Sequence, residues 1–497
     1  MSWWQRRLRF DRGSPPSARL VLAVCLTTGF ATLFDSAALV VAAPILRTDL
    51  GVEASSLQWV LAGYSLTFGL ALIPAGRLGD AIGRPVLLAC GMVLFSTASI
   101  VGATATEPTA LVIARLVQGV GAGTANPQVI GLLQDRFSGS ARARALGAYT
   151  SVGSAAALLA PVFAGGVLDA TAPRVGWRLV VLLNVPLGYL AAALSLLFLA
   201  RKLVRAPRGR PVDVDPVGLV AVTALTLLLL LPVVAQESEP IRWAAGGILF
   251  VGVGALFVWW ERRYAYRGRL PLITPALARA PGFAMGCLVA TFTFGSALGF
   301  SAVLMLFLQE ALSLSPFAAG VVTIPGAVVS MVTANLSWRV LRRFGRPGVT
   351  VVLGIKTLIA VAAAVALLTV PIAWLLPVLV AMQTLTGAVS GLGGPPNQAL
   401  TLEHAPHDQH GVAAGVLQVS QRISATLCIA ALVGLYATAA PAALDVDGSR
   451  AALVLVSAAS AVLGMLATTC SAIDAARSPM PRAELSEPAR AGVTRGV

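Results

Sequence analysis

The chain alternates long apolar segments with short polar ones that hold charged residues, glycine or proline. Most apolar segments are about 20 residues long or more, the length that an α-helix needs to cross a hydrocarbon core of about 30 Å. They lack the alternation of membrane β-strands. The pattern predicts an all-α polytopic membrane protein with fourteen transmembrane helices. The predicted spans are 20–44, 56–75, 85–105, 109–133, 144–168, 177–200, 216–235, 241–260, 283–308, 317–338, 349–370, 372–396, 412–438 and 450–472.

Composition and charge agree with a membrane protein. The hydrophobic fraction of 57% and the mean hydropathy of +0.83 are too high for a soluble domain of 497 residues. A net charge of +15 would suggest nucleic acid in a soluble protein, but the basic residues gather in alternate loops beside membrane lipids. The positive-inside rule then puts both termini in the cytoplasm, with no nucleic-acid partner. The opposite loops hold only Arg47, Arg174, Arg242 and Arg450.

An internal repeat divides the chain. The tripeptide Gly-Arg-Pro at 83–85 recurs at 345–347, and the segment 121–128 recurs loosely at 391–398 at nearly the same offset. Two six-span halves related in this way enclose a site near the middle of the membrane. The predicted divisions are an N-terminal cytoplasmic segment (1–19), an N-terminal half (20–200), a basic linker (201–215), two inserted helices (216–262), a cytoplasmic loop (263–282), a C-terminal half (283–473) and a disordered tail (474–497).

Several motifs resemble one transporter family. Residues 76–85 read Gly-Arg-Leu-Gly-Asp-Ala-Ile-Gly-Arg-Pro, which resembles the loop between helices 2 and 3 of the major facilitator superfamily. Residues 34–44, 115–119 and above all 177–188 (Trp-Arg-Leu-Val-Val-Leu-Leu-Asn-Val-Pro-Leu-Gly) are similar to its 14-spanner drug:proton antiporter family. The resemblance runs from about 20 to 472. It implies the major facilitator fold, with two inserted helices between the six-helix halves.

The resemblance also implies roles for two elements. The 76–85 loop would latch the outward-facing state, with Asp80 near the start of helix 3 paired to a cation; a role in loop rigidity and topology alone is the alternative. Small residues in the fifth span would form the antiporter helix. The residues assigned to gating are Arg77, Gly79, Asp80, Gly83, Arg84 and Arg422, and those assigned to the antiporter helix are Gly153, Pro161, Gly165 and Gly166.

Asp35 is the only acidic residue placed deep within a predicted span. A carboxylate in hydrocarbon costs several kcal/mol unless it is paired, protonated or hydrated, which indicates a function. Arg115 differs from Asp35 in depth by only about 5 Å at the helical rise. We hypothesise a switchable pair: a proton arriving at Asp35 frees Arg115, and substrate competes for the same site. A static pair that only satisfies two polar groups is the alternative.

Further polar and aromatic residues are candidates for the substrate cavity. Lys356 and Arg422 would make the cavity positive if both face it, which favours anionic, zwitterionic or amphiphilic substrates. The alternatives are a Lys356 side chain that extends to the membrane surface and an Arg422 that belongs to the inner gate. The predicted cavity residues are Thr28, Thr32, Phe34 and Asn126.

The sequence holds no phosphate-binding loop, and His404, His407 and His410 are interpreted as an ordinary polar loop, so no cofactor or metal is predicted. The prediction is a monomeric, proton-coupled exporter of lipophilic or amphiphilic small molecules in the bacterial cytoplasmic membrane, and not an enzyme. A dedicated exporter of one natural product or lipid keeps the same fold. Remoter alternatives are a membrane-embedded transferase and a sensor without transport.

Overall fold

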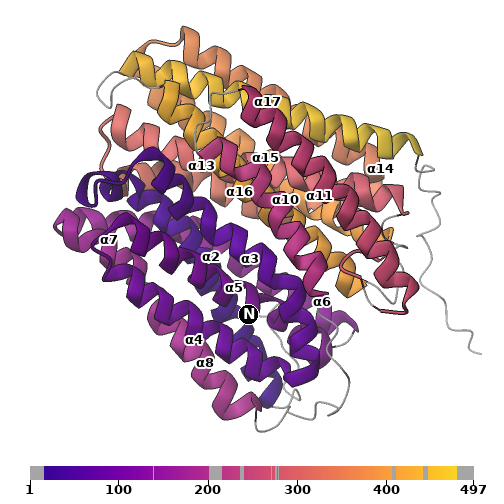
Figure 1. The fold of residues 1–497 in the computed structure, drawn as a ribbon. Helices are drawn as coiled ribbons and strands as arrows, with labels where there is room; N and C mark the ends of the chain where they lie inside the picture. Colours follow the sequence, from indigo (N-terminus) through magenta and orange to yellow (C-terminus); the bar gives the residue numbers. More distant parts are fainter. Residues whose placement is uncertain are drawn as a thin grey trace, which may run out of the picture.

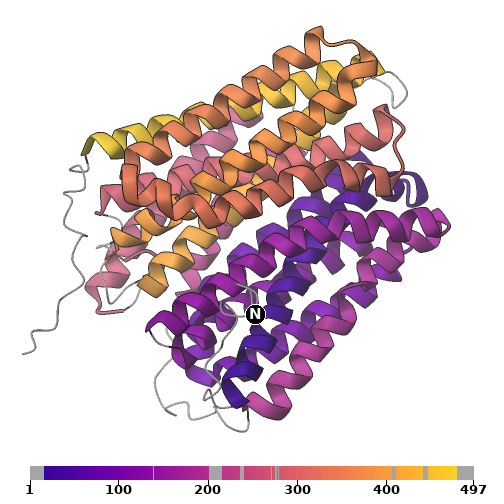
Figure 2. The ribbon, with the colours of Figure 1, turned by 180° about the vertical axis from the view of Figure 1, so that it is seen from behind.

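The computed structural model describes residues 16–477 apart from 138, 201–214, 235–239, 270, 275–276, 278, 406–409 and 440–445. The described residues form helices joined by short loops, without a strand among them. The helices make two bundles that lie side by side (Figures 1 and 2). One bundle comes from the N-terminal half of the chain and the other from the C-terminal half, as the internal repeat predicted.

The first half begins with five long helices and ends with a broken one. Pro186, near the start of α8, has no amide hydrogen to donate, and the last span separates into α7 and α8 at Asn184. The break leaves Asn184 buried inside the bundle. The elements are α2 (Pro16–Asp49), α3 (Ala54–Ile82), α4 (Arg84–Ala103), α5 (Pro108–Arg136), α6 (Gly139–Ala170), α7 (Pro173–Leu182), α8 (Val185–Leu194) and the π-helical turn η1 (Ser195–Ala200).

Two inserted helices precede the second half. The first of them, α10, packs against α3 and α16 at the seam between the halves, and α11 packs on α10. The seam itself is formed largely by α3 with α16 and by α6 with α14. The elements are α10 (Pro216–Val234), α11 (Pro240–Tyr266), α13 (Pro281–Leu306), the π-helical turn η2 (Phe307–Ala311), α14 (Pro316–Thr369), α15 (Ile372–Glu403), α16 (His410–Ala439) and α17 (Val446–Arg477).

The repeated Gly-Arg-Pro tripeptide has the same backbone role in both halves. Gly83 separates α3 from α4 at φ 112°, and Gly345 interrupts α14 at φ 54° and ψ −140°. These conformations are rarely open to residues with a Cβ. The second kink lies within α14, which contains two helices and supplies two segments long and apolar enough to cross a membrane, Pro316–Arg339 and Arg343–Thr369.

Twelve of the described helical segments are long and apolar enough to cross a membrane. The apolar part of α10, Pro216–Leu231, is shorter, and α5 is not among the twelve because polar residues interrupt it. The count of fourteen spans therefore stays a prediction. One predicted boundary is wrong: residues 474–477, assigned to the tail, continue α17, because Asp474 is buried there in an ion pair with Arg346 at 2.6 Å. The rest of the tail and the basic linker at 201–214 lie outside the described residues.

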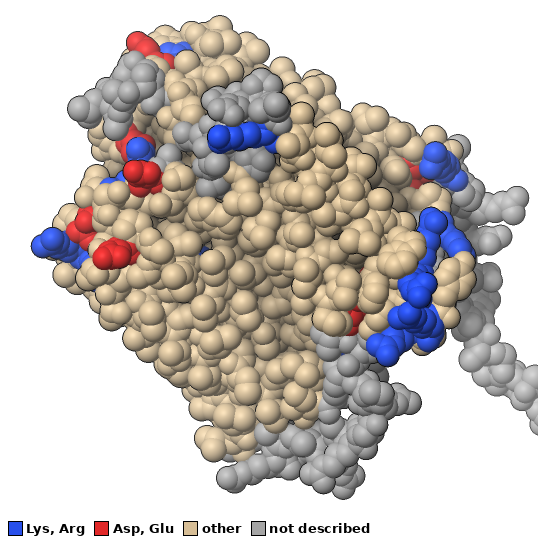
Figure 3. All heavy atoms as spheres, viewed as in Figure 1, with Lys and Arg blue, Asp and Glu red and all other residues tan. Residues whose placement is uncertain are grey.

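On the face that Figure 3 shows, the exposed charged side chains gather at the two ends of the molecule. Figure 3 shows a broad band without Lys, Arg, Asp or Glu between them on the visible face. Apolar side chains of several helices point outward, among them Ile248, Leu358 and Leu368. Such a band buries itself in lipid, since water would not solvate it. We call the end that holds Asp49 and Glu310 the Asp49 end, and the opposite one, with Arg84 and Arg346, the Arg84 end.

Candidate functional site: a buried carboxylate network and a central cavity

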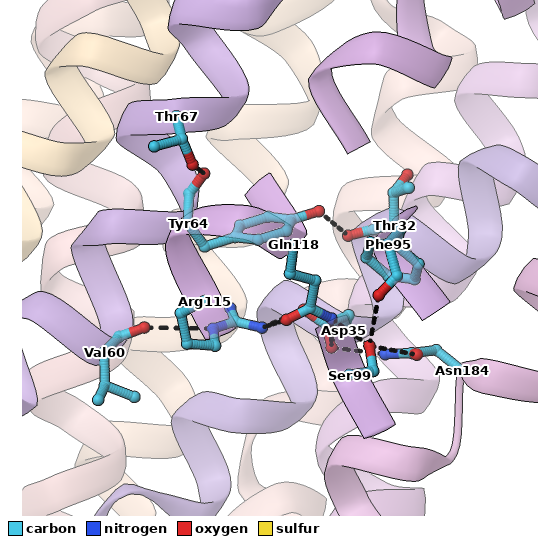
Figure 4. A network of polar contacts seen from close by, with 10 residues as sticks. All are labelled: Thr32, Asp35, Val60, Tyr64, Thr67, Phe95, Ser99, Arg115, Gln118 and Asn184. Carbon is cyan, nitrogen blue, oxygen red and sulfur yellow. Dashed lines mark hydrogen bonds and ion pairs between the residues drawn. The ribbon is translucent and has the colours of Figure 1, made fainter. Parts of the chain in front are cut away.

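Asp35 on α2 and Arg115 on α5 form a buried ion pair. Arg115 Nη1 lies 2.6 Å from Asp35 Oδ2, and both side chains are only 3% exposed. The pair meets inside the first half, as Figure 4 shows, where neither group is solvated. The depth matching of the two residues along their helices therefore led to the correct contact.

The carboxylate of Asp35 accepts two more hydrogen bonds. Gln118 Nε2 donates to Oδ1 at 2.9 Å, and Asn184 Nδ2 donates to the same oxygen at 2.5 Å. Gln118 also donates to Ser99 Oγ at 2.7 Å, which fixes its amide. Three donors, two from α5 and one from the break between α7 and α8, thus hold the carboxylate in place.

Arg115 is held from its other side by α3. Its Nε donates to the carbonyl oxygen of Val60 at 3.3 Å, and its guanidinium carbon lies 4.5 Å from the centre of the Tyr64 ring. The Tyr64 hydroxyl in turn donates to the carbonyl oxygen of Thr32 on α2 at 3.0 Å. The ion pair thus connects three helices, and any movement of Arg115 changes contacts on α3.

Sequence reasoning missed Gln118 and Asn184. Gln118 follows Arg115 by three residues and therefore lies on the same helix face. Asn184 belongs to the 177–188 string, which pointed to the family but not to a role for its asparagine. The signal for Gln118 was available in the spacing, whereas the position of Asn184 depends on the break between α7 and α8.

A cavity of about 720 Å³ lies between the two halves. Side chains from α2, α3, α5, α6, α13, α14, α15, α16 and α17 line it, and no Asp or Glu is among the described lining residues. The α14 wall follows one face of the helix, at three- and four-residue spacing. After Gly345 this face carries Leu353, Lys356, Thr357, Ala360, Ala363 and Leu367; Ile359, and Thr323, Gly326, Ala327 and Ser330 before Gly345, line the cavity as well.

Three of the four predicted cavity residues do not line this cavity. The hydroxyl groups of Thr28 and Thr32 donate to carbonyl oxygens one turn earlier in α2, and both residues are buried. Phe34 packs in the core and stacks on Phe30, with ring centres 5.4 Å apart. Only Asn126 lines the cavity, where its Nδ2 donates to the Tyr149 hydroxyl at 2.8 Å.

Comparison with known proteins identifies the family. The model of the Major Facilitator Superfamily matches residues 25–428. The chain belongs to this superfamily. Its 14-spanner branch remains a prediction. The chain is 34% identical over 464 residues to the probable actinorhodin transporter of Streptomyces coelicolor, covering 90% of this chain and 78% of the relative. It is 31% identical to the multidrug efflux pump LfrA of Mycolicibacterium smegmatis, covering 67% of this chain and 64% of the relative.

A solved structure agrees with the superfamily fold. A POT family transporter crystallised with 5-aminolevulinic acid superposes with a TM-score of 0.66. The likeness covers 93% of this chain and 98% of that one, at 15% sequence identity. At this identity the likeness concerns the fold alone.

The predicted gating loop of this major facilitator lies at the Arg84 end. Arg77 Nη2 donates to the carbonyl oxygen of Pro271 at 2.7 Å, which ties α3 to the loop after the inserted helices. The Arg84 guanidinium lies 3.3 Å from the carboxylate of Asp135 on α5. Gly79 has no room for a Cβ, which would overlap the Gln128 side chain. The side chain of Asp80 lies outside the described part of the structure.

Arg422 joins the cavity to the seam. It lines the cavity, and its guanidinium carbon lies 4.0 Å from the centre of the Phe68 ring on α3 of the opposite half. A Cβ at Gly69 would stand 2.8 Å from the Arg422 Cβ, so the two helices touch here. Arg422 therefore faces the cavity and contacts the opposite half at the same time, so the two alternatives for its position do not exclude each other.

The predicted antiporter helix, α6, contacts both the cavity and the second half. Gly153 and Pro161 line the cavity. Gly165 meets the start of α14, where an added Cβ would lie 2.5 Å from the carbonyl oxygen of Pro316. A Cβ at Gly166 would make only an ordinary contact of 3.7 Å with the Phe317 ring. Small residues thus permit close packing between the halves at this crossing.

Proposed function

We propose that this chain is a proton-coupled antiporter that exports lipophilic or amphiphilic small molecules across the bacterial cytoplasmic membrane, with both termini in the cytoplasm. The superfamily and the relatives named as a transporter and as an efflux pump support export. A cavity of about 720 Å³ between the halves has the size of a site for drug-like molecules. The basic loops at the Arg84 end support the orientation.

The observation that carries the coupling is the triply hydrogen-bonded carboxylate of Asp35. An ionisable group inside a membrane bundle marks a functional site by default. When Asp35 binds a proton, Arg115 loses its counter-ion and the new hydroxyl group has to donate. At least one of the three donors then loses its acceptor, so proton binding rearranges the network.

The rearrangement reaches the seam through α3. Arg115 donates to the Val60 carbonyl, and the carbonyl of Ala62, half a turn away, accepts from Thr426 Oγ1 of α16 at 3.4 Å. Asp35 itself does not line the cavity, although its neighbour Ser36 does. We therefore replace direct competition between proton and substrate by coupling through helix movement: the proton acts on α2, α3 and α5, while the cargo occupies the cavity.

The structure is closed at the Asp49 end. Arg47 Nη1 on α2 lies 2.8 Å from Glu310 Oε1 in the second half, and Gln309 Nε2 donates to the Val41 carbonyl at 3.0 Å. With the proposed orientation, this end faces outward, so cargo in the cavity is shut off from the outside. Opening the Asp49 end would release it.

Replacement of Asp35 by asparagine tests the coupling. Asp35→Asn keeps a polar side chain of the same size but cannot exchange a proton, so proton-driven efflux should be abolished at normal protein levels. Growth of an efflux-deficient host on a panel of toxic compounds, and proton flux in proteoliposomes, measure the effect. Glu107→Gln alters an exposed carboxylate before α5 and should behave as wild type. Undiminished efflux by Asp35→Asn would refute the proposal.

A dedicated exporter of one natural product is the second candidate. It is favoured by the relative named as a probable actinorhodin transporter, whereas the one named as a multidrug pump favours a broad range. The same panel separates the two, because a dedicated exporter protects against one compound class only. Transport by the purified chain would also exclude a sensor without transport activity.

A further inference from the structure

The central cavity carries positive charge that no described acidic side chain of its wall compensates. Two cations line it, Lys356 on α14 and Arg422 on α16. The Asp35–Arg115 pair, which is neutral as a unit, lies outside the lining. A low-dielectric cavity with uncompensated cations attracts anions and repels cations. The charge of the wall therefore bears on which cargo the cavity accepts.

The two cations have different surroundings. Arg422 rests on aromatic faces, 4.0 Å from the Phe68 ring centre and 5.8 Å from that of Phe294, and these contacts offset part of its charge. No hydrogen bond or ion pair reaches Lys356 Nζ from any residue that the structure describes. A bound anion would therefore stabilise the charge of Lys356 more than that of Arg422.

The position of Lys356 excludes a lipid-facing side chain. It shares the cavity face of α14 with Leu353, Thr357 and Ala360, whereas the lipid-exposed residues Ile355 and Leu358 lie on another face. This arrangement settles the choice between extension to the membrane surface and orientation into the cavity. A charged lysine at a protein-lined cavity inside a membrane is stabilised by a counter-charge, and no described Asp or Glu of the lining supplies one.

Other groups of the same cavity lining suit a cargo with an acidic group and an apolar body. Ser460 of α17 lines the same cavity, and its hydroxyl group has no hydrogen-bond partner within the described residues. Phe292, Phe294 and Phe300 of α13 supply aromatic wall, which accommodates a flat apolar body. The cavity thus combines an anion-binding point with an aromatic surface.

From this arrangement we infer that the cargo is an amphiphilic organic anion, a flat apolar body bearing a carboxylate or another acidic group, and that Lys356 binds the acidic group. The inference rests on the proposed function, in which the cavity carries the cargo, and adds the substrate class. Phosphate of an anionic lipid headgroup shares the chemistry of such a cargo, so the experiment has to separate the two.

Three pyrene probes that differ only in charge test the inference. They are 1-pyrenebutyrate, 1-pyrenebutanol and (1-pyrenebutyl)trimethylammonium, titrated by fluorescence against the purified full chain in phosphatidylcholine nanodiscs, with empty nanodiscs as blanks. The wild type should bind the carboxylate at least tenfold more tightly than the alcohol, which corresponds to about 1.4 kcal/mol. It should bind the trimethylammonium probe most weakly.

Substitutions of Lys356 then test whether its charge causes the preference for the carboxylate probe. Lys356→Met should remove the tenfold preference and leave alcohol binding within twofold of wild type, while Lys356→Arg should retain the preference. Retained alcohol binding also shows that the variant is folded. Equal binding of all three probes by the wild type would overturn the substrate class. A carboxylate preference that survives in Lys356→Met would overturn the role of Lys356. Equal loss of binding of all three probes in Lys356→Met would overturn that role as well.

Two further experiments distinguish a lipid headgroup from a cargo, and a failure of the export proposal from a failure of the anion site. Phosphatidylglycerol added to the nanodiscs should not displace 1-pyrenebutyrate; displacement that depends on Lys356 would make the occupant a lipid headgroup and overturn the cargo assignment. Transport of 1-pyrenebutyrate in proteoliposomes under a proton gradient tests export itself. If that transport fails while the carboxylate preference holds, the proposed function is wrong and the anion site stands.

Discussion

At the scale of single residues, the carboxylate of Asp35 is hydrogen-bonded to neutral donors as well as paired with Arg115. Asn184 Nδ2 donates to Oδ1 at 2.5 Å from the break between α7 and α8. A hydrogen bond to a charged group contributes roughly 1.5–3 kcal/mol. Its loss should weaken the network but leave the proton-exchanging group in place.

We therefore expect Asn184→Ala to reduce proton-driven efflux about tenfold, in contrast to the complete loss in Asp35→Asn. Initial rates in proteoliposomes under an imposed proton gradient measure the difference. Ser99→Ala is the comparison variant, because Ser99 accepts a hydrogen bond from Gln118 and donates one to Asn184 Oδ1 at 3.4 Å but makes no hydrogen bond to the carboxylate. It should change the rate less than threefold; a Ser99→Ala defect equal to that of Asn184→Ala would contradict the assignment.

The sequence could predict how deep in the membrane a residue lies, but not which way its side chain points. Counting along two spans brought Asp35 and Arg115 to one level, and the ion pair is present at 2.6 Å. Thr28 and Thr32 lie on the same helix as Asp35, yet they bond within α2 and miss the cavity. Which face of a helix meets a cavity depends on how the neighbouring helices pack, and one sequence does not fix this packing.

At the scale of elements, α6 closes against α14 through its glycines. At Gly165 an added Cβ would lie 2.5 Å from the Pro316 carbonyl oxygen and 2.6 Å from the Phe317 Cα. Backbone atoms cannot move aside as a flexible side chain can. Overpacking of this kind costs roughly 1–3 kcal/mol, and here the cost falls on the state that is closed at the Asp49 end.

Gly165→Ala should therefore shift the molecule toward opening at the Asp49 end and reduce efflux at least fivefold. Gly166→Ala is the matched control on the next residue, where the added Cβ makes an ordinary 3.7 Å contact; it should remain within twofold of wild type. Efflux rates of both variants at matched protein levels decide the matter. Equal effects at the two positions would mean that close packing at Gly165 is not what closes the end.

The repeat and the order of helices were predictable from the sequence because apolar length and Gly-Arg-Pro punctuation are local signals. Gly83 and Gly345 both adopt positive φ, as tripeptides with one structural role should. Other features were not local. The extension of α17 to Arg477 depends on the buried Arg346–Asp474 pair, whose partners lie far apart in the chain.

At the scale of the whole molecule, the halves meet most tightly where α3 crosses α16. The Gln58 amide on α3 is buried there without a hydrogen-bond partner among the described residues, and a Cβ at Gly434 would lie 2.5 Å from its Nε2. An unpaired buried amide costs roughly 1–3 kcal/mol. The seam is thus less than optimal for stability, which suits an interface that has to separate in every transport cycle.

The ion pair between Arg47 and Glu310 links the halves at the Asp49 end, at 2.8 Å with 37% and 14% of the side chains exposed. We expect Arg47→Glu, which sets two carboxylates against each other, to open this end, and Arg47→Glu with Glu310→Arg to close it again. The labelling rate of a cysteine at Ser301 on the cavity wall, in a cysteine-free background, should rise three- to tenfold in the single variant and return toward the starting value in the double variant. A membrane-impermeant maleimide applied to whole cells reports on the outer face. If the double variant labels as fast as the single one, closure of the Asp49 end depends on the packing of α6 on α14 and not on this ion pair.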